Sequence, residues 1–112
     1  MVKRIIAYMN ENYASHISLD QIAANMYLSP VYISKIFKEE TGESPIRYLI
    51  KIRLEKAKEI LGKENCGSVR NVSLAVGYED VYYFSKLFKK YYGIAPLYYK
   101  RQAQKENGKE IK

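Results

Sequence analysis

A fourteen-residue pattern occurs twice in this chain of 112 residues and limits what the chain can fold into. The first copy, YISKIFKEETGESP, covers residues 32–45, and the second, YFSKLFKKYYGIAP, covers residues 83–96. Seven of the fourteen positions are identical. Upstream, residues 22–28 align with residues 72–78 at an offset of 50, whereas the offset further on is 51. A length change confined to one turn is typical of a duplicated helix–turn–helix unit, because turns tolerate insertions better than helices do.

Helix-start and helix-stop signals divide the chain into short helices. Candidate N-caps precede several apolar segments, and two glycines stand where helices are expected to end in the left-handed conformation. The N-caps are Ser18 (with Gln21 completing a capping box), Ser29, Ser44 and Asp80, and the glycines are Gly42 and Gly93. Pro30 and Pro45 follow two of these caps at the first helical position, which suits proline. The pattern predicts helices over residues 2–12, 19–26, 30–41, 45–61, 69–76, 81–92 and 96–105.

The predicted fold class is therefore all-α, with two helix–turn–helix subdomains (homeodomain-like three-helix units) joined by a long linker helix. We expect the first subdomain over residues 1–44, the linker over 45–61, the second subdomain over 62–106 and a frayed tail over 107–112. The apolar side of the linker comprises Ile46, Leu49, Ile50, Leu54, Ala57, Ile60 and Leu61. Arg53 lies close to that side, and we interpret it as a structural ion-pair or capping residue.

The two repeated helices, 30–41 and 81–92, each have an apolar side and a polar side. The apolar sides are Ile33, Ile36 and Phe37 in the first copy and Phe84, Leu87, Phe88 and Tyr91 in the second. The polar sides are Val31, Ser34, Lys35 and Lys38 in the first copy and Tyr82, Ser85, Lys86 and Lys89 in the second. An apolar side repeats because it fills the same small core, whereas a polar side has no packing reason to repeat.

Small hydroxyls and lysines suit a helix that approaches base edges and phosphates closely. The matched polar sides therefore predict two DNA-recognition helices. Either side taken alone is also typical of an ordinary solvated helix face.

The formal net charge of +7 is concentrated at one end, since residues 86–112 carry a balance of +6. This excess favours a polyanionic partner, nucleic acid before membrane, with a solvated basic tail as the alternative. No apolar run is long enough for a transmembrane helix, and no signal peptide is indicated. The single cysteine, Cys66, fits a reducing cytoplasm. With His16 as the only histidine and no Gly-rich phosphate loop, we expect no enzyme, no metal and no cofactor.

The stretch VSLAVGYEDVYYFSKLFKKYYGIAPLYYKR resembles the AraC/XylS family of bacterial transcription regulators, specifically its C-terminal DNA-binding domain. Residues 18–61 are similar to the first helix–turn–helix and linker of that family, and the resemblance covers residues 2–101. It implies two recognition helices, 30–41 and 81–92, in successive major grooves on one face of DNA. The family's base-reading positions, carried over, fall on Val31, Ser34, Lys35, Val81, Tyr82, Ser85 and Lys86. Contacts with the DNA backbone are expected at Ser29, Pro30, Lys38, Lys89 and Lys90.

The chain departs from the family pattern in two places. Val72-Ser73 stands where the family usually has Ile-Ala, which is predicted to loosen that helix. Val31 and Val81 offer only methyl groups, so base choice there should lean towards thymine.

The resemblance also implies partners and a context. Double-stranded DNA is the expected partner, RNA polymerase is a further candidate, and no membrane association or location outside the cytoplasm is expected. Family members usually carry a sensing or dimerisation domain, which we expect to be missing from this chain. The chain would then be the output domain of a longer regulator, such as a two-component response regulator, or an excised domain.

The alternative function is a small helical protein-interaction module, in which the twelve tyrosines form an adhesive surface. We instead interpret many of them, including Tyr48, Tyr83, Tyr91 and Tyr99, as core or hinge packing. Binding to random duplex DNA separates the two functions, because phosphate neutralisation makes affinity fall steeply with salt.

Overall fold

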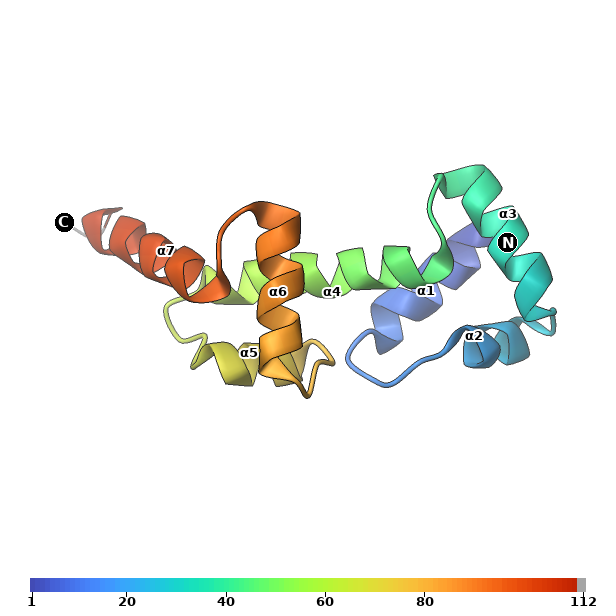
Figure 1. The fold of residues 1–112 in the computed structure, drawn as a ribbon, viewed down its shortest axis with the longest axis horizontal. Helices are drawn as coiled ribbons and strands as arrows, with labels where there is room; N and C mark the ends of the chain where they lie inside the picture. Colours follow the sequence, from blue (N-terminus) through green and yellow to red (C-terminus); the bar gives the residue numbers. More distant parts are fainter. Residues whose placement is uncertain (111–112) are drawn as a thin grey trace. The chain divides into compact units, whose positions relative to one another are not determined.

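The computed structural model describes the backbone of residues 1–110 and the side chains of residues 1–106. Over that range the chain forms seven helices and no strand, which confirms the all-α fold class (Figure 1). The helices are α1 (Val2–Asn12), α2 (Leu19–Met26), α3 (Pro30–Thr41), α4 (Pro45–Leu61), α5 (Val69–Ala75), α6 (Val81–Tyr92) and α7 (Pro96–Glu110). Five have the predicted bounds, and α5 ends one residue early. The α7 helix runs to Glu110, five residues beyond its predicted end, while residues 111–112 lie outside the described residues.

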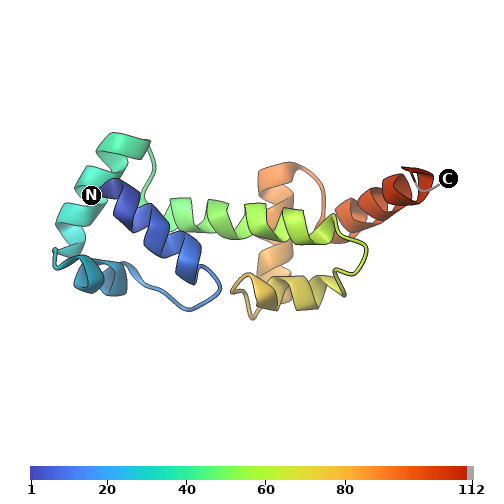
Figure 2. The same ribbon diagram turned by 180° about the vertical axis from the view of Figure 1, so that it is seen from behind.

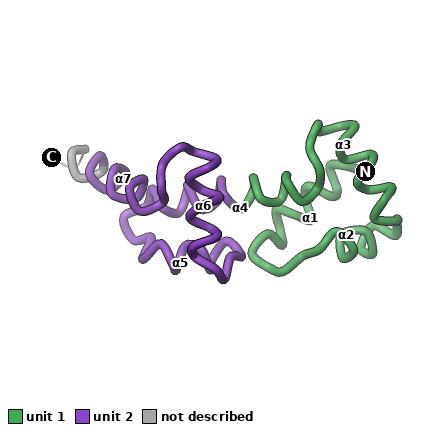
Figure 3. The backbone as a smooth tube through the Cα atoms, viewed as in Figure 1, with its two compact units in different colours: residues 1–53 green, residues 54–112 purple. Residues whose placement is uncertain are grey.

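The helices belong to two compact units, residues 1–53 and residues 54–112 (Figure 3). The division falls inside α4, so the first half of this helix belongs to the first unit and the second half to the second unit. Each unit contains one copy of the repeat. The helix–turn–helix pair is α2 and α3 in the first unit and α5 and α6 in the second, and the two helices of each pair contact each other.

In the first unit, α1 packs against both α2 and α3 and closes the core (Figures 1 and 2). The buried core residues are Val2, Ile5, Met9, Ile22, Ala23, Ile33, Phe37, Leu49 and Ile52. Phe37 is fully buried, and its ring meets the ring of Tyr48 edge-on at 5.2 Å between centroids. The predicted apolar side of residues 30–41 is confirmed, with Ile33 and Phe37 buried and Ile36 half-buried at its border.

Arg53 closes the C-terminal end of α1. Its Nε donates a hydrogen bond to the carbonyl oxygen of Tyr13 at 2.7 Å, and an Nη donates to the carbonyl oxygen of Ser15 at 2.8 Å. The last carbonyls of a helix have no partner within the helix, and a cation there also opposes the negative end of the helix dipole. The capping role predicted for Arg53 is confirmed.

An aromatic cluster occupies the core of the second unit. Phe88 of α6 is fully buried, and its ring centroid lies 4.8 Å from that of Tyr92 and 6.0 Å from that of Tyr99. The Lys58 ammonium sits over the rings of Tyr92 and Tyr99, at 4.7 and 5.8 Å from their centroids. Burial, together with the negative charge of Glu55, raises the pKa of Tyr92. Lys58 packs on neutral phenol rings, an arrangement that cation–π attraction favours.

The turns of the two helix–turn–helix pairs carry the same hydrogen bond. The N–H of Leu28 donates to the carbonyl of Ala23 at 3.0 Å, and the N–H of Tyr78 donates to the carbonyl of Ser73 at 2.9 Å, fifty residues later. The next helices begin after the N-caps Ser29 and Asp80, which are fifty-one residues apart. The inserted residue therefore lies between Tyr78 and Asp80, as the alignment predicts.

Ser73 adds a contact that the first copy lacks. This side chain is fully buried, and its hydroxyl donates to the carbonyl of Tyr78 at 2.7 Å. Ala23, at the corresponding position of the first unit, has no hydroxyl. The departure predicted to loosen α5 instead joins this helix to the turn that follows it.

Tyr27, the C-cap of α2, adopts a left-handed conformation with φ of 56°, and its counterpart in the repeat is Gly77 with φ of 100°. A left-handed backbone costs an L-residue about 1–2 kcal/mol, and Tyr27 is 93% exposed, so its ring gains little from packing. We expect Tyr27→Gly to exceed Tyr27→Ala in free energy of unfolding by about 1 kcal/mol, measured by urea denaturation. Both variants lose the ring, and only alanine keeps the Cβ. Equal stabilities would contradict a backbone origin of the strain.

Four side chains differ in burial from the sequence prediction. Tyr91, assigned to the apolar side of residues 81–92, is 45% exposed, because Tyr92 rather than Tyr91 packs on Phe88. Tyr83, interpreted as core or hinge packing, is also exposed. In α4, Ile46 is exposed although it was assigned to the apolar side, and Ile52, which was not assigned, is buried.

Candidate nucleic-acid interface

Local sequence signals fix both ends of α3. Ser29 Oγ accepts a hydrogen bond from the N–H of Tyr32 at 3.2 Å, and Pro30 occupies the first position of the helix. The helix ends at Gly42, whose φ of 82° is left-handed. With Ile33 and Phe37 turned into the core, the opposite side of α3 faces solvent.

The outer side of α3 carries the residues predicted to read DNA. Val31 is 80% exposed, and Lys35 and Lys38 are exposed along the same side. Ser34 is half-buried and lies at the edge of this face rather than at its centre. The face therefore presents an isopropyl group, which can contact a thymine methyl, and two ammonium groups, which can donate to guanine or to phosphate.

In α6 a carboxylate caps the helix. Asp80 Oδ1 accepts hydrogen bonds from the N–H groups of Tyr82 at 3.0 Å and Tyr83 at 3.2 Å. The helix ends at Gly93, with φ of 76°. The negative charge of Asp80 thus lies against the positive end of the helix dipole, where it is stabilised.

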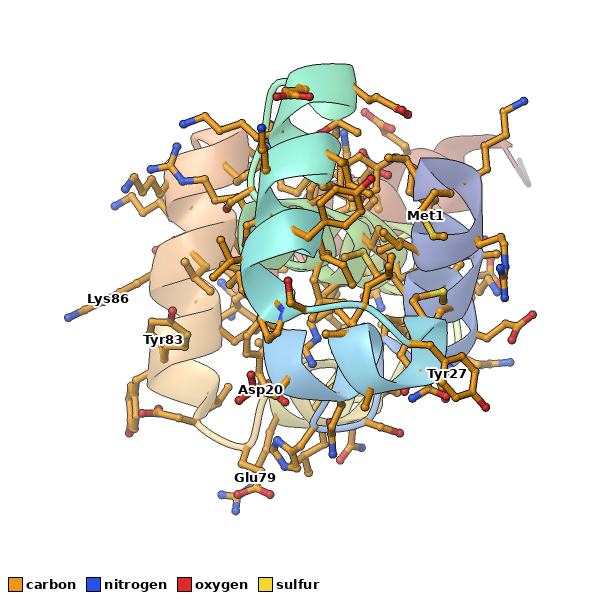
Figure 4. All side chains as sticks on the ribbon, turned by 90° about the vertical axis from the view of Figure 1, so that its right-hand side faces the viewer. Met1, Asp20, Tyr27, Glu79, Tyr83 and Lys86 are labelled. Carbon is orange, nitrogen blue, oxygen red and sulfur yellow. The ribbon has the colours of Figure 1, made fainter. Side chains whose placement is uncertain are left out.

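The outer side of α6 resembles that of α3 but is more basic. Tyr82 is 81% exposed, and Lys86, Lys89 and Lys90 are all exposed. The Lys86 side chain extends away from the helix (Figure 4). The two remaining predicted base readers, Val81 and Ser85, are half-buried, and Ser85 occupies the same edge position as Ser34 in α3.

Five exposed residues on α3 and α6 were not predicted as site residues, namely Tyr32, Glu39, Glu40, Tyr83 and Tyr91. Tyr32 and Tyr83 occupy equivalent positions beside Val31 and Tyr82, and each is about half exposed. Glu39 is also exposed, one turn beyond Lys35. Helical geometry could have found Tyr32, Tyr83 and Glu39. The direction opposite the buried pair in each helix points at Lys35 or Lys86, and these three residues lie nearer to it than the serines do.

Other kinds of site find little support in the described residues. Among them, no three His, Cys, Asp or Glu side chains gather closely enough to hold a metal ion. No helix within the described range is long and apolar enough to cross a membrane.

Comparison of the sequence with known protein families bears on the outer sides of both α3 and α6. A family model described as a helix-turn-helix domain, of the AraC type, matches residues 22–102, which include α3 and α6. The chain belongs to the AraC/XylS family. The resemblance that the sequence carries is thereby confirmed, and the AraC/XylS assignment covers both copies of the repeat.

The curated AraC/XylS relatives are described as regulators of transcription or of operons. The chain is 38% identical over 96 residues to the raffinose operon transcriptional regulatory protein RafR of Pediococcus pentosaceus, covering 86% of this chain and 34% of that protein. It is 35% identical over 102 residues to the MmsAB operon regulatory protein of Pseudomonas aeruginosa, covering 91% of this chain and 33% of that protein. The chain thus spans about a third of the length of these relatives.

Solved AraC/XylS structures share the fold. The C-terminal domain of AraT, a response regulator from Geobacillus stearothermophilus, is 37% identical with a TM-score of 0.84, over 90% of this chain and 84% of that one. The DNA-binding domain of AdpA, solved in complex with a target DNA, has a TM-score of 0.87 over 94% of each chain. Because AdpA is only 22% identical, it supports the fold alone.

Proposed function

We propose that this chain binds double-stranded DNA in a sequence-specific way and so regulates transcription, with α3 and α6 each entering a major groove. The proposed base readers are Val31, Ser34, Lys35, Val81, Tyr82, Ser85 and Lys86. The proposed contacts with the DNA backbone are Ser29, Pro30, Lys38, Lys89 and Lys90. Ser29 Oγ acts as an acceptor in its cap, and its hydroxyl proton can still donate to a phosphate oxygen.

The observation that carries this proposal is the pairing of two exposed faces. Lys35 and Lys86 stand at equivalent positions of α3 and α6, and Lys38 and Lys89 do so one turn later. All four lysines are exposed. Membership of the AraC/XylS family supports the same function, since its curated relatives are described as operon regulators.

A protein-interaction module remains the alternative, and a specific observation favours it. Several tyrosines away from the outer sides of α3 and α6 are exposed, among them Tyr27, Tyr91 and Tyr98. A protein-interaction module is not expected to bind random duplex DNA. For a protein that neutralises phosphates, the logarithm of the binding constant falls with the logarithm of the salt concentration, with a slope of about −0.9 per phosphate contact. A sensing or dimerisation domain, a contact with RNA polymerase and a cytoplasmic location stay predictions from the family resemblance.

We expect Lys86→Ala, and separately Lys35→Ala, to weaken binding to a selected site by about tenfold or more, because a base contact contributes about 1–3 kcal/mol. The site is first obtained by in-vitro selection from random duplexes, and affinity is then measured by gel-shift titration at fixed salt. The matched control is Lys63→Ala, which removes an equally exposed charge from the loop between α4 and α5.

Two outcomes would count against the proposed interface. The first is that both recognition-helix variants bind as tightly as the Lys63→Ala control. The second is that the selected sites contain one motif instead of two half-motifs about one helical turn apart, the spacing expected for two helices in successive major grooves.

A further inference from the structure

The two recognition helices carry opposite charges at one equivalent position. Glu39 of α3 and Lys90 of α6 are fifty-one residues apart, the same offset that relates Lys35 to Lys86. Both side chains are exposed. Each lies one turn beyond the central lysine of its helix and therefore shares that lysine's side of the helix.

This reversal changes the charge of the whole helix. The α3 segment carries Lys35 and Lys38 against Glu39 and Glu40, so its formal charge is zero. The α6 segment carries three lysines and no acidic residue, so its charge is +3. The same bias holds for the units, since residues 1–53 have a balance of +2 and residues 54–112 a balance of +5.

Glu39 also stands where a helix disfavours it. It lies in the last turns of α3, near the negative end of the helix dipole, where a carboxylate is unfavourable by a few tenths of a kcal/mol or more. Among the residues that the structure describes, no cation forms an ion pair with Glu39. Asp80, the residue before α6, differs because it accepts hydrogen bonds from the N–H groups of Tyr82 and Tyr83. Lys35, four residues earlier, offsets a few tenths of a kcal/mol of that cost, so helix stability gives no net reason for a carboxylate at position 39.

We propose that Glu39 repels phosphate from the outer side of α3 and so weakens the contact of this helix with any duplex. The proposal rests on the proposed DNA-binding function, and it gives α3 and α6 different roles in binding. The lysines of α6 supply most of the salt-dependent attraction to any duplex. The α3 helix, with Glu39 beside Lys35, engages only where its base contacts outweigh the repulsion.

The test compares Glu39→Gln with wild type on a random duplex and on the selected site, at 50 and 200 mM salt. Removing the charge should raise affinity for the random duplex about two- to threefold at 50 mM salt, as expected for unit charges about 7 Å apart in water. It should raise affinity for the selected site by at least as much, because α3 is docked there and the carboxylate lies close to phosphate. Glu64→Gln, an equally exposed change in the loop between α4 and α5, is the matched control.

Two charge-reversing variants test the same repulsion through the salt dependence of DNA affinity. Glu39→Lys should add about one phosphate contact, steepen the log–log salt slope by about 0.9 and add about a threefold loss of affinity between 50 and 200 mM salt. Lys90→Glu should flatten the slope by a similar amount. Because lysine suits the last turn of a helix, Glu39→Lys is expected to fold.

The outcomes distinguish this inference from the proposed function. If wild type shows no salt-dependent binding to duplex DNA, the proposed function fails. If wild type binds but Glu39→Gln and Glu64→Gln behave alike, only the role of Glu39 is overturned. If Glu39→Gln instead loses affinity for the selected site, Glu39 accepts a hydrogen bond from a base such as cytosine, and the repulsive role is overturned as well.

Discussion

Replacing Phe88 by alanine should unfold the second unit at or near room temperature. Phe88 is fully buried, and its ring contacts those of Phe84, Tyr92 and Tyr99. Truncating a buried phenylalanine costs about 3–5 kcal/mol, because the transfer free energy is lost and a cavity remains. Small domains are stabilised by only about 5–15 kcal/mol in total, so this one change removes much of the stability available to the unit.

Hydrogen exchange followed by mass spectrometry can assign the loss to one unit. In Phe88→Ala, peptides from α5 and α6 should lose protection, while those from α2 and α3 keep most of theirs. The matched variant is Phe37→Ala, at the equivalent position of the repeat, and it should give the reverse pattern. Phe88→Leu keeps most of the volume and should cost less than about 1.5 kcal/mol. Uniform loss of protection in both units would show that their stabilities are not separable.

The helix bounds could be predicted because their signals are local. Ser18, Ser29 and Asp80 each accept hydrogen bonds from backbone N–H groups within three residues, and Gly42 and Gly93 end helices in a conformation that glycine adopts readily. Such signals act within one turn of the chain and need no knowledge of the tertiary fold. The α7 helix was under-predicted at its C-terminal end, where the sequence offers no stop signal apart from Gly108.

Side-chain burial was harder to predict because it depends on which residues of the neighbouring helices pack against each side chain. Helical periodicity puts Tyr91 near the apolar side of α6, but the ring that packs on Phe88 belongs to Tyr92. The strain at Tyr27 was also missed, because the residue is a poor left-handed former and only comparison with Gly77 indicates its conformation. The role of Ser73 could be predicted only with the knowledge that the Tyr78 carbonyl lies within hydrogen-bonding distance of the Ser73 hydroxyl.

In the candidate site too, some features could be predicted from the sequence and others could not. The lysines predicted from the repeat are exposed on α3 and α6, because a long charged side chain opposite a buried apolar pair has no other place to lie. The serines are half-buried, since they lie at the border between core and solvent. Glu39 was missed because the prediction used positions that are identical in the two copies. At this position the copies differ, with glutamate in α3 and Lys90 in α6.

Replacing Arg53 by alanine should be the most damaging single change outside the hydrophobic core of the first unit. Its guanidinium donates to the carbonyls of Tyr13 and Ser15 at 2.7 and 2.8 Å, across about forty residues of chain. Hydrogen bonds from a charged donor contribute about 1.5–3 kcal/mol each, and truncation leaves the end of α1 without these partners. We expect a loss of about 3 kcal/mol in the free energy of unfolding, measured by urea denaturation with circular dichroism.

The geometry of the guanidinium makes Arg53→Lys an informative control. A lysine keeps the charge but carries a single ammonium, which cannot reproduce the planar fork that reaches both carbonyls. It should therefore recover only part of the lost stability, with increased hydrogen exchange in α1, which ends at the residue before Tyr13. If charge near the helix end were the whole effect, Arg53→Lys would match wild type. If the two hydrogen bonds contributed nothing, Arg53→Ala would lie within about 0.5 kcal/mol of wild type, as surface substitutions do.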